Sequence, residues 1–385
     1  MKKKQKVTAC KTHDVSCGVP RVIVAMSGGV DSSVAAALLK ERGFEVEGIY
    51  MKLFDGENSA EENVRAVAEK LNIRLKIVDF RKEFKKAVID SFLREFARAR
   101  TPNPCVVCNQ QIKFGLLFDR VLKMGGDYIA TGHYARVKCE IPNYKKQIAN
   151  KSQIPNSKIQ YHLLSAKDKT KDQLYFLYNL TQEKLEKILF PLGDYKKTEI
   201  YLMAKKMNLP YKKGESVDIC FIAGGDHRDF LKKYLKMKPG KIVDVSGKVL
   251  STHSGLPLYT IGQRADIGGP GPFYVVEMDS KKNLLVVTNN SRDPKLFRKS
   301  LLAENVNWIS GIEPKLPLKC KARIRYGHAA VEAIVSARDS ISLKRLNLLR
   351  EYEVIFKTPQ RAITPGQSVV FCDRNETLGG GVIGS

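Results

Sequence analysis

Two sets of residues in this 385-residue sequence suggest a reactive or ligand-binding site. One is the string Ser-Gly-Gly-Val-Asp-Ser-Ser at 27–33, and the other is made of the cysteines Cys105, Cys108 and Cys220. Glycine-rich loops expose backbone amides that bind phosphate oxygens at helix N-termini. Thiolates act as nucleophiles and as metal ligands. The sequence therefore predicts a phosphate-binding loop and a centre of cysteine chemistry.

The Ser/Gly string lies between an apolar, β-rich run at 21–26 and a helical run at 34–40. A loop in this place directs amides and the positive end of the helix dipole toward an anion. It is not a Walker loop, because it does not end in Gly-Lys-Ser/Thr and holds no lysine to reach a γ-phosphate. A bare Ser-Gly-Gly turn could simply join strand to helix. The full string, with Asp31 after Val30, favours a nucleotide site.

Cys105 and Cys108 form a Cys-x-x-Cys pair in a proline-rich segment that begins at Thr101. Such a pair can be redox-active, half of a zinc site or part of an iron–sulfur site. A zinc ribbon needs a second pair, which the sequence lacks, so Cys220 is the natural third participant. Without a secretory signal, eight cysteines indicate reduced thiols rather than a disulfide framework. Cys10 and Cys17 have no assignable role.

Strands and helices alternate along the first part of the chain. Strands are predicted at 21–26, 46–51, 75–79 and 127–133, with helices at 34–40 and 60–71 between them. This alternation predicts an α/β fold with a parallel sheet. Ligands of such sheets bind at the carboxyl ends of the strands, where Ser27, Met51, Asp79 and Gly132 would converge.

The rest of the chain does not continue the alternation of strands and helices. Residues 138–160 are polar and basic and predict an exposed inserted loop, followed by helices at 182–189 and 196–207. From about residue 240, short β runs predict a small β-containing middle domain and a C-terminal β-barrel. We expect three domains: a catalytic domain at 1–220, a central domain at 221–298 and a barrel at 299–385.

Charge and hydropathy limit the classes of partner. Sixty-six Lys and Arg against 40 Asp and Glu give a formal charge of +26, which favours a polyanion such as nucleic acid. The alternative to a polyanionic partner is that the excess positive charge lies on a solvated surface and has no binding role. The apolar runs are far shorter than the roughly 18 residues of a membrane span. We therefore expect no membrane association and a cytoplasmic location.

These motifs carry two resemblances. The loop at 27–33 resembles that of N-type ATP pyrophosphatases, in which it grips the pyrophosphate portion of ATP while AMP is transferred to a substrate. From about residue 21 to 383, the chain resembles the family of bacterial tRNA-specific 2-thiouridylases. This resemblance rests on the matched strings at 27–33, 101–104, 132–134, 171–173, 219–222, 259–264, 364–367 and 379–381.

The resemblance implies site residues, carried over position by position. ATP would contact Ala25, Met26, Ser27, Gly28, Gly29, Val30, Asp31, Ser32, Met51 and Gly132. Transfer RNA would contact His133, Lys171, Asp172, Gln173, Arg325, Tyr326 and Gln367, and the target base would lie against Asn103, Pro104 and Cys105. An aromatic ring such as that of Tyr326 stacks on an unpaired base, and arginine binds phosphate.

The family's chemistry is ATP-dependent replacement of the C2 oxygen of the wobble uridine, U34, by sulfur, with Mg²⁺ accompanying the ATP. By resemblance, Cys220 carries the persulfide and Cys108 is the nucleophile that resolves it, so a disulfide bond belongs to the expected chemistry. The implied partners are the anticodon loops of the tRNAs for Lys, Glu and Gln, and an upstream sulfur carrier or cysteine desulfurase.

The sequence departs from the family pattern at two places. Many members have Asp where this chain has Cys105, so the catalytic assistance proposed for that Asp is in doubt here. The thiols of Cys105, Cys108 and Cys220 could instead ligate a [4Fe–4S] cluster with one open iron, as in related tRNA thiolases. The segment before Cys220 reads Ser-Val-Asp-Ile-Cys rather than the common Ser-Thr-Gly-Ile-Cys.

Two other functions were weighed. An ATP-dependent ligase of a small molecule, such as an argininosuccinate synthetase-like or amidotransferase-linked enzyme, would share the phosphate loop but would leave the cysteines and the charge unexplained. A non-catalytic RNA-binding protein with a relict nucleotide fold would be expected to have lost Asp31 or Cys220, and both are present. The hypothesis of a tRNA uridine 2-sulfurtransferase accounts for the phosphate loop, the cysteines and the positive charge together.

Overall fold

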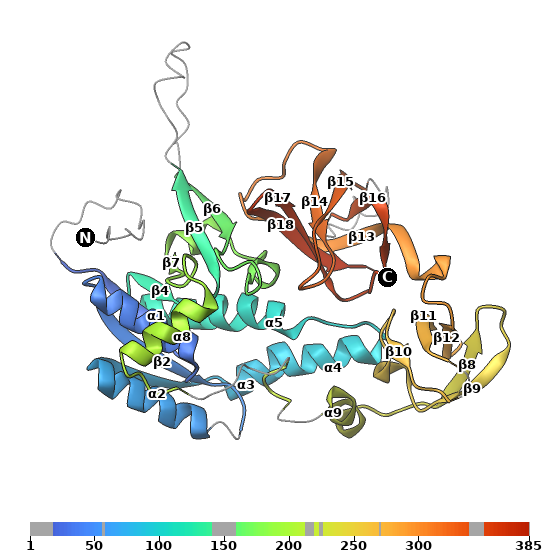
Figure 1. Ribbon diagram of the computed structural model, residues 1–385, viewed down its shortest axis with the longest axis horizontal. Coiled ribbons are helices and arrows are strands. Elements are labelled where there is room, and N and C mark those ends of the chain that lie inside the picture. Colours follow the sequence, from blue (N-terminus) through green and yellow to red (C-terminus); the bar gives the residue numbers. More distant parts are fainter. Residues whose placement is uncertain are drawn as a thin grey trace, which may run out of the picture.

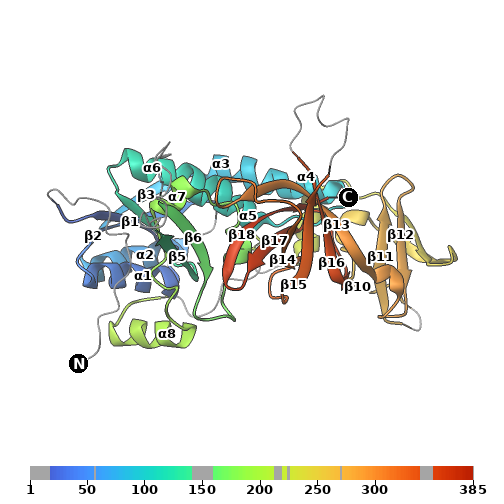
Figure 2. The same cartoon turned by 90° about the horizontal axis from the view of Figure 1, so that it is seen from above.

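The computed structural model describes residues 18–55, 58–140, 159–211, 219–222, 226–268, 271–338 and 350–384. Within them, the strands form three sheets. The views in Figures 1 and 2 agree that the C-terminal barrel lies between the N-terminal sheet and the middle sheet along the long axis of the molecule.

The N-terminal sheet is parallel, as the alternating pattern predicts. Its strands have the order β3-β2-β1-β4-β7. Their bounds are β1 Arg21–Ala25, β2 Glu45–Lys52, β3 Arg74–Asp79, β4 Tyr128–Ala130 and β7 Ile188–Leu189. The helices that cross between or flank them include α1 Val30–Glu41, α2 Asn58–Leu71, α6 Leu117–Lys123, α7 Gln182–Glu186 and α8 Lys197–Lys206.

Both faces of this sheet are buried, because successive residues of a strand point to opposite sides. Val22 and Val24 of β1 pack in one cluster with residues of α1 and α2. Ile23 between them packs in a second cluster with residues of α6. Burial on both faces explains the nearly continuous apolar run of β1. The loop that follows β1 emerges at the carboxyl end of this strand.

Two helical rods lie beside the sheet and extend toward the middle sheet (Figure 1). The first consists of α3 Arg81–Phe84, a π-helical turn at Lys85–Ile89 and α4 Asp90–Ala97. The second consists of α5 Pro104–Val107, a longer π-helical stretch at Cys108–Leu116 and then α6. The π-helical stretches widen the helix, a distortion that is frequent at functional sites.

The middle sheet has the strand order β10-β11-β12-β8-β9 and is preceded by α9 His227–Tyr234. Its strands are β8 Gly240–Asp244, β9 Val249–His253, β10 Arg264–Ala265, β11 Phe273–Asp279 and β12 Leu284–Thr288. Phe92 and Phe96 of α4 pack with Leu231 of α9 and with Leu258, which precedes β10. The first helical rod is thereby anchored to α9 and to the segment that precedes β10.

The C-terminal strands close into a six-stranded barrel, because β13 pairs with both β16 and β18. The strands are β13 Phe297–Trp308, β14 Leu318–Arg323, β15 Val331–Ala337, β16 Tyr352–Arg361, β17 Ser368–Asp373 and β18 Glu376–Ile383. A hairpin of the N-terminal domain, β5 Ala135–Glu140 and β6 Gln160–Ser165, adds to this sheet through Thr377 opposite Leu163. The barrel is therefore joined edge to edge with the domain that holds the phosphate loop.

The structure confirms the predicted fold class and corrects two local predictions. The helix expected at 182–189 ends at Glu186, because Ile188 and Leu189 pair with β4 as an edge strand. Part of the loop expected at 138–160 is strand, since residues up to Glu140 and from Gln160 belong to the hairpin. Residues 141–158, Cys10 and Cys17 lie outside the described residues. The proposed domain boundaries at 220 and 298 stay predictions.

Candidate active site

The string at 27–33 forms a tight loop between β1 and α1, as expected. Gly28 has φ +79°, and a Cβ there would lie 2.6 Å from the carbonyl oxygen of Ala60 in α2. Ser32 Oγ accepts a hydrogen bond from the Ser27 N–H at 3.1 Å and donates one to the Gly29 carbonyl at 3.1 Å. The loop is thus held in one shape at the N-terminus of α1, where helix amides favour an anion.

Asp31, in the first turn of α1, is engaged by two groups from distant parts of the chain. Lys197 Nζ at the start of α8 lies 2.8 and 2.7 Å from its two carboxylate oxygens. The Tyr134 hydroxyl donates to the same carboxylate at 2.7 Å. Burial, followed by the charge of Asp31, raises the pKa of Tyr134, so this hydroxyl keeps its proton. A cation therefore lies beside the phosphate loop although the loop has none.

The other residues predicted to contact ATP surround this loop. Gly132, just after β4, approaches α1 so closely that a Cβ would lie 2.9 Å from the amide nitrogen of Ser32. Met26 is buried and donates its N–H to the Ile49 carbonyl of β2 at 2.9 Å. Ala25 ends β1, Val30 is buried in α1, and Met51 is half-buried near the end of β2. Gly132 and Met26 therefore lie next to the loop, while Met51 lies two residues beyond Ile49, the β2 partner of Ala25.

Cys105 and Cys108 lie on successive helical turns of the second rod. Asn103 caps α5 by accepting a hydrogen bond from the Val106 N–H at 3.3 Å, and Pro104 occupies the first turn, where its missing N–H costs nothing. Cys105 is half-buried and Cys108 is buried. Burial raises the pKa of the Cys108 thiol, and the ammonium of Lys113 opposes this in part. Cys108 is therefore mainly a protonated thiol at neutral pH.

Cys220 is exposed, but its neighbour Phe221 links it to Cys108. Phe221 packs against the apolar cluster that contains Cys108, Phe84 and Ile112. A hollow of about 940 Å³ opens beside it. The hollow is lined among others by Leu53, Phe54, Arg81, Lys85, Phe230 and Tyr234. The end of β2, the first helical rod and α9 thus meet at the place where Cys220 reaches the surface.

Neither the expected disulfide bond nor the three-cysteine cluster site is present among the described residues. Cys108 and Cys220 are both thiols in this structure, so the expected disulfide bond is not formed. Among the described residues, no group of three or more His, Cys, Asp or Glu is placed to hold a metal ion. One thiol is buried in an apolar cluster while another faces solvent, so Cys105, Cys108 and Cys220 as arranged do not fit a three-cysteine cluster site.

The residues predicted to contact tRNA divide into buried and exposed groups. His133 is buried against Phe114 and Phe190, and burial holds the pKa of its imidazole well below 6.5. Asp172 is only 7% exposed, and burial raises the pKa of its carboxyl. Gln173 Oε1 accepts from the Tyr134 N–H at 2.9 Å. Two of these three residues are therefore buried, and the third binds the backbone of the segment that follows β4.

Tyr326 and Arg325 lie on the barrel. The ring of Tyr326 is 41% exposed and contacts Phe176 at a centroid distance of 4.6 Å. Arg325 donates to the Ala362 carbonyl and to Thr364 Oγ1, both at 3.2 Å. Lys171 is half-buried, and Gln367 contacts the segment before Asn103. Among the predicted RNA contacts, Tyr326 is thus exposed, whereas His133 and Asp172 are buried.

Sequence reasoning did not identify Lys197 or the hydroxyl of Tyr134 as parts of the site. Lys197 lies 166 residues after Asp31, so no spacing rule connects them. Tyr134 follows the predicted Gly132-His133 pair, and only its place next to that pair could have drawn attention to it. Both residues are visible only when α8 and the end of β4 are placed around α1.

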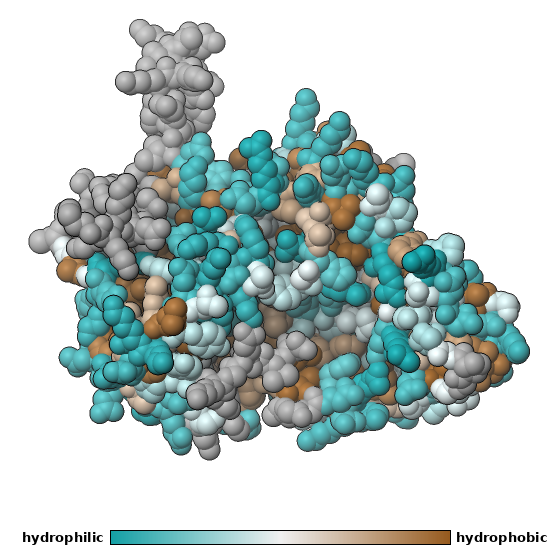
Figure 3. Space-filling model, viewed as in Figure 1, coloured by the Kyte–Doolittle hydropathy of each residue, from teal (hydrophilic) through white to brown (hydrophobic). Residues whose placement is uncertain are grey.

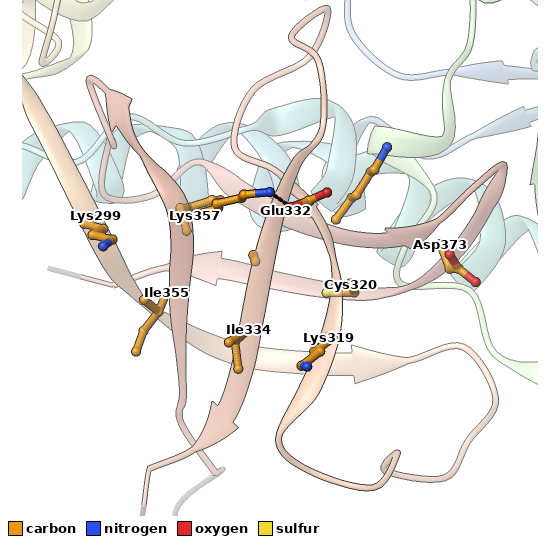
Figure 4. A pocket seen from close by; sticks show the side chains of 11 residues that line it. Lys299, Lys319, Cys320, Glu332, Ile334, Ile355, Lys357 and Asp373 are labelled. Atoms are coloured by element: carbon orange, nitrogen blue, oxygen red, sulfur yellow. Dashed lines mark hydrogen bonds and ion pairs between the residues drawn. The ribbon is translucent and has the colours of Figure 1, made fainter.

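A second hollow lies on the outer face of the barrel, away from these residues. It measures about 610 Å³. Figure 4 shows Ile334 and Ile355, which are opposite each other on β15 and β16, with Lys299, Lys319 and Lys357 around them. No residue predicted for ATP, sulfur or tRNA lines it. The surface seen in Figure 3 is mainly hydrophilic, with apolar side chains in small groups.

None of the described helices has the length and apolar character needed to cross a membrane.

Comparisons with known proteins agree with this architecture. Residues 20–224 match the family described as tRNA methyl transferase HUP domain. Residues 228–289 match the tRNA methyl transferase PRC-barrel domain, and residues 298–383 match the aminomethyltransferase beta-barrel domain.

Curated relatives match over almost the whole chain. The tRNA-specific 2-thiouridylase MnmA of Carboxydothermus hydrogenoformans is 42% identical over 384 residues, which cover 95% of this chain and 98% of the relative. That of Roseiflexus sp. is 41% identical, with 94% and 99% covered. The U34-tRNA thiolase NcsA from Methanococcus maripaludis, solved with its [4Fe–4S] cluster, is 22% identical over 54% of this chain and 64% of its own. Its TM-score is 0.35, too low to contribute to the assignment. Identity of this extent with the curated relatives means that the chain belongs to the tRNA-specific 2-thiouridylase family.

Proposed function

We propose that this chain uses ATP to replace the C2 oxygen of U34 in tRNA by sulfur, giving 2-thiouridine, AMP and pyrophosphate. The observation that supports the proposal is one apolar cluster that reaches from the end of β2 to Cys108. Met51, near the end of β2 and predicted to contact ATP, packs against the same cluster as Cys108 and Phe221. An activated carbonyl and a sulfur nucleophile would therefore lie close together.

The phosphate loop and its surroundings are suited to the activation step. The N-terminus of α1 and the ammonium of Lys197 would stabilise the charge that develops on the departing pyrophosphate. Asp31 fits a Mg²⁺ ion that accompanies ATP, because Mg²⁺ needs only one or two protein carboxylates when phosphates and waters supply the rest. Lys197 and Tyr134 hold that carboxylate in place. The uridine C2 oxygen attacks the α-phosphorus of ATP, and the bond to pyrophosphate breaks.

We propose the persulfide route for the sulfur. The terminal sulfur of a Cys220 persulfide attacks C2 of the activated uridine, and AMP leaves with the former C2 oxygen. The Cys108 thiolate then attacks the Cys220 sulfur, so an S–S bond to Cys108 forms while the bond to the transferred sulfur breaks. The electron pair stays on that sulfur and gives 2-thiouridine. A thiol reductant must then return both cysteines to thiols. Exposure of Cys220 suits receipt of sulfur from an upstream sulfur carrier or cysteine desulfurase.

The substrate would be the anticodon loop of the tRNAs for Lys, Glu and Gln, bound in the cytoplasm. The charge of +26 supports binding to the phosphate backbone. Tyr326 offers a ring on which an unstacked base can rest, and extruding such a base costs only a few kcal/mol. Asn103, Pro104 and Cys105, at the start of α5, would line the pocket for the uracil.

The test is mass spectrometry of nucleosides from unmodified tRNA after incubation with anaerobically purified protein. The reaction contains ATP and either a persulfide donor or inorganic sulfide. We expect ATP-dependent 2-thiouridine with the persulfide donor in the wild type, and none in Cys220→Ala or Cys108→Ala. Cys372→Ala, which removes a half-buried barrel thiol, is the matched control and should keep the wild-type rate.

The two sulfur sources separate the alternatives. Thiolation that depends on sulfide and on iron, and that also requires Cys105, would replace the persulfide route by the cluster route. Absence of 2-thiouridine with both sources would contradict the function itself and would direct attention to a small-molecule ligase.

A further inference from the structure

The segment that leads into the predicted base pocket is hydrogen-bonded to the barrel and to the middle domain. The Thr101 N–H donates to the Pro365 carbonyl at 2.9 Å. The Thr101 carbonyl accepts from Gln367 Nε2 at 3.0 Å, and its hydroxyl lies 3.0 Å from the hydroxyl of Thr260. Each polar group of Thr101 thus has a partner in the barrel loop or in the middle domain.

The residues on either side of Thr101 are held in the same way. Gln367 Nε2 also donates to the Pro102 carbonyl at 3.3 Å. Arg100, 17% exposed, places its guanidinium 3.3 Å from the Glu304 carboxylate of β13 and 3.2 Å from the Ile383 carbonyl of β18. Three consecutive residues are therefore bonded to the barrel.

The barrel loop that makes these contacts has a defined shape. Gly366 has φ +89°, and a Cβ there would lie 2.9 Å from the Thr101 carbonyl oxygen. Its N–H donates to the Ile383 carbonyl at 2.9 Å, and the Ile383 N–H donates to the Gln367 carbonyl at 2.7 Å. Only glycine combines this backbone conformation with so close an approach. The loop is therefore anchored to β18 and presses directly on Thr101.

Pocket geometry depends on this segment, because the target-base residues follow at once. Asn103 is two residues after Thr101 and caps α5, the helix that carries Cys105 and leads into Cys108. A shift of Thr101 would move the cap and both thiols. Misplacement of reacting groups by about 1 Å can lower a rate by about 100-fold.

We propose that Gln367 is a positioning residue. It holds the Thr101 and Pro102 carbonyls so that Asn103 and Cys105 face the uracil, and through it the barrel sets the geometry of the base pocket. The resemblance implied instead that Gln367 contacts tRNA. The structure engages its side-chain nitrogen with two backbone carbonyls. The proposal rests on the function proposed above, since it concerns the same pocket.

Gln367→Glu is the direct test, because it keeps the shape but turns an oxygen toward two carbonyl oxygens. We expect the kcat of thiolation to fall at least about tenfold, with tRNA affinity within about twofold of wild type. A second assay contains no ATP, tRNA or sulfur donor and measures the rate at which iodoacetamide alkylates Cys105, by peptide mass spectrometry. We expect this rate in Gln367→Glu to differ from the wild-type rate at least about fivefold. Thr260→Val removes the hydroxyl contact with less disturbance and should shift the alkylation rate in the same direction.

The control is Gln360→Glu, which alters a barrel glutamine bonded to Thr358 of its own strand. Loss of tRNA affinity by tenfold or more in Gln367→Glu, with an unchanged Cys105 alkylation rate, would make Gln367 an RNA contact and overturn the proposal. Wild-type values in every assay would overturn it too. The alkylation assay needs no turnover, so it remains decisive if the wild-type protein fails to thiolate tRNA.

Discussion

Replacing Lys197 by methionine tests the cation that the tertiary structure places beside the phosphate loop. The change keeps the length of the side chain and removes its charge, which lies 2.7 Å from the Asp31 carboxylate. Lys197 is 12% exposed and Asp31 33%, so the pair is partly solvated. Breaking a fully buried pair costs about 3–5 kcal/mol, so partial solvation reduces the expected loss of unfolding free energy to about 1–2 kcal/mol.

The catalytic loss should be larger than the loss of stability. At an effective dielectric constant of about 20, a unit charge about 4 Å from a phosphate oxygen would contribute at most about 4 kcal/mol, and the paired Asp31 carboxylate lowers that contribution. Removal of one such preorganised group typically lowers kcat by about 10²–10³. We therefore expect tRNA-dependent release of AMP and pyrophosphate, measured under saturating ATP, to fall by that factor in Lys197→Met.

Lys206→Met is the matched control, because it removes an exposed lysine from the last turn of the same helix. It should retain the wild-type rate. A double-mutant cycle with Asp31→Asn should give a coupling of at least about 1 kcal/mol, since the two groups are in contact. A rate in Lys197→Met within threefold of wild type, in a protein that unfolds at the wild-type temperature, would refute the reasoning.

Two further predictions concern groups that the structure constrains. Burial raises the pKa of the Cys108 thiol, so its thiolate is scarce at neutral pH. The single-turnover rate of 2-thiouridine formation should therefore rise with pH from about 7 to 9, and a flat profile would show that resolution by Cys108 does not limit this rate. Gly28→Ala puts a Cβ against the Ala60 carbonyl at a positive φ. We expect at least about tenfold weaker ATP binding, measured by calorimetry, or a loss of about 1–3 kcal/mol in unfolding free energy; wild-type values of both would contradict a strained loop.

Local patterns predicted the first half of the fold well. The buried parallel strands appear as apolar runs, and the glycines of the loop at 27–33 restrict what can follow β1. The errors have a tertiary cause. Ile188 and Leu189 look helical in sequence, yet they complete the edge of the sheet beside β4. The barrel could be predicted as β structure. Its closure depends on the pairing of β13 with β16 and with β18, and both of these strands lie far from β13 in the sequence.

The candidate residues for chemistry could be predicted from local patterns, because the loop at 27–33 and the cysteines are short strings with a physical meaning. The groups that surround these residues could be identified from the folded chain alone. The fold placed Lys197 on Asp31, buried Cys108 while exposing Cys220, and bonded Gln367 to Thr101. The pairs Lys197–Asp31 and Gln367–Thr101 are separated by more than a hundred residues, and their contacts depend on how distant elements pack. Spacing along a chain contains no information about that packing.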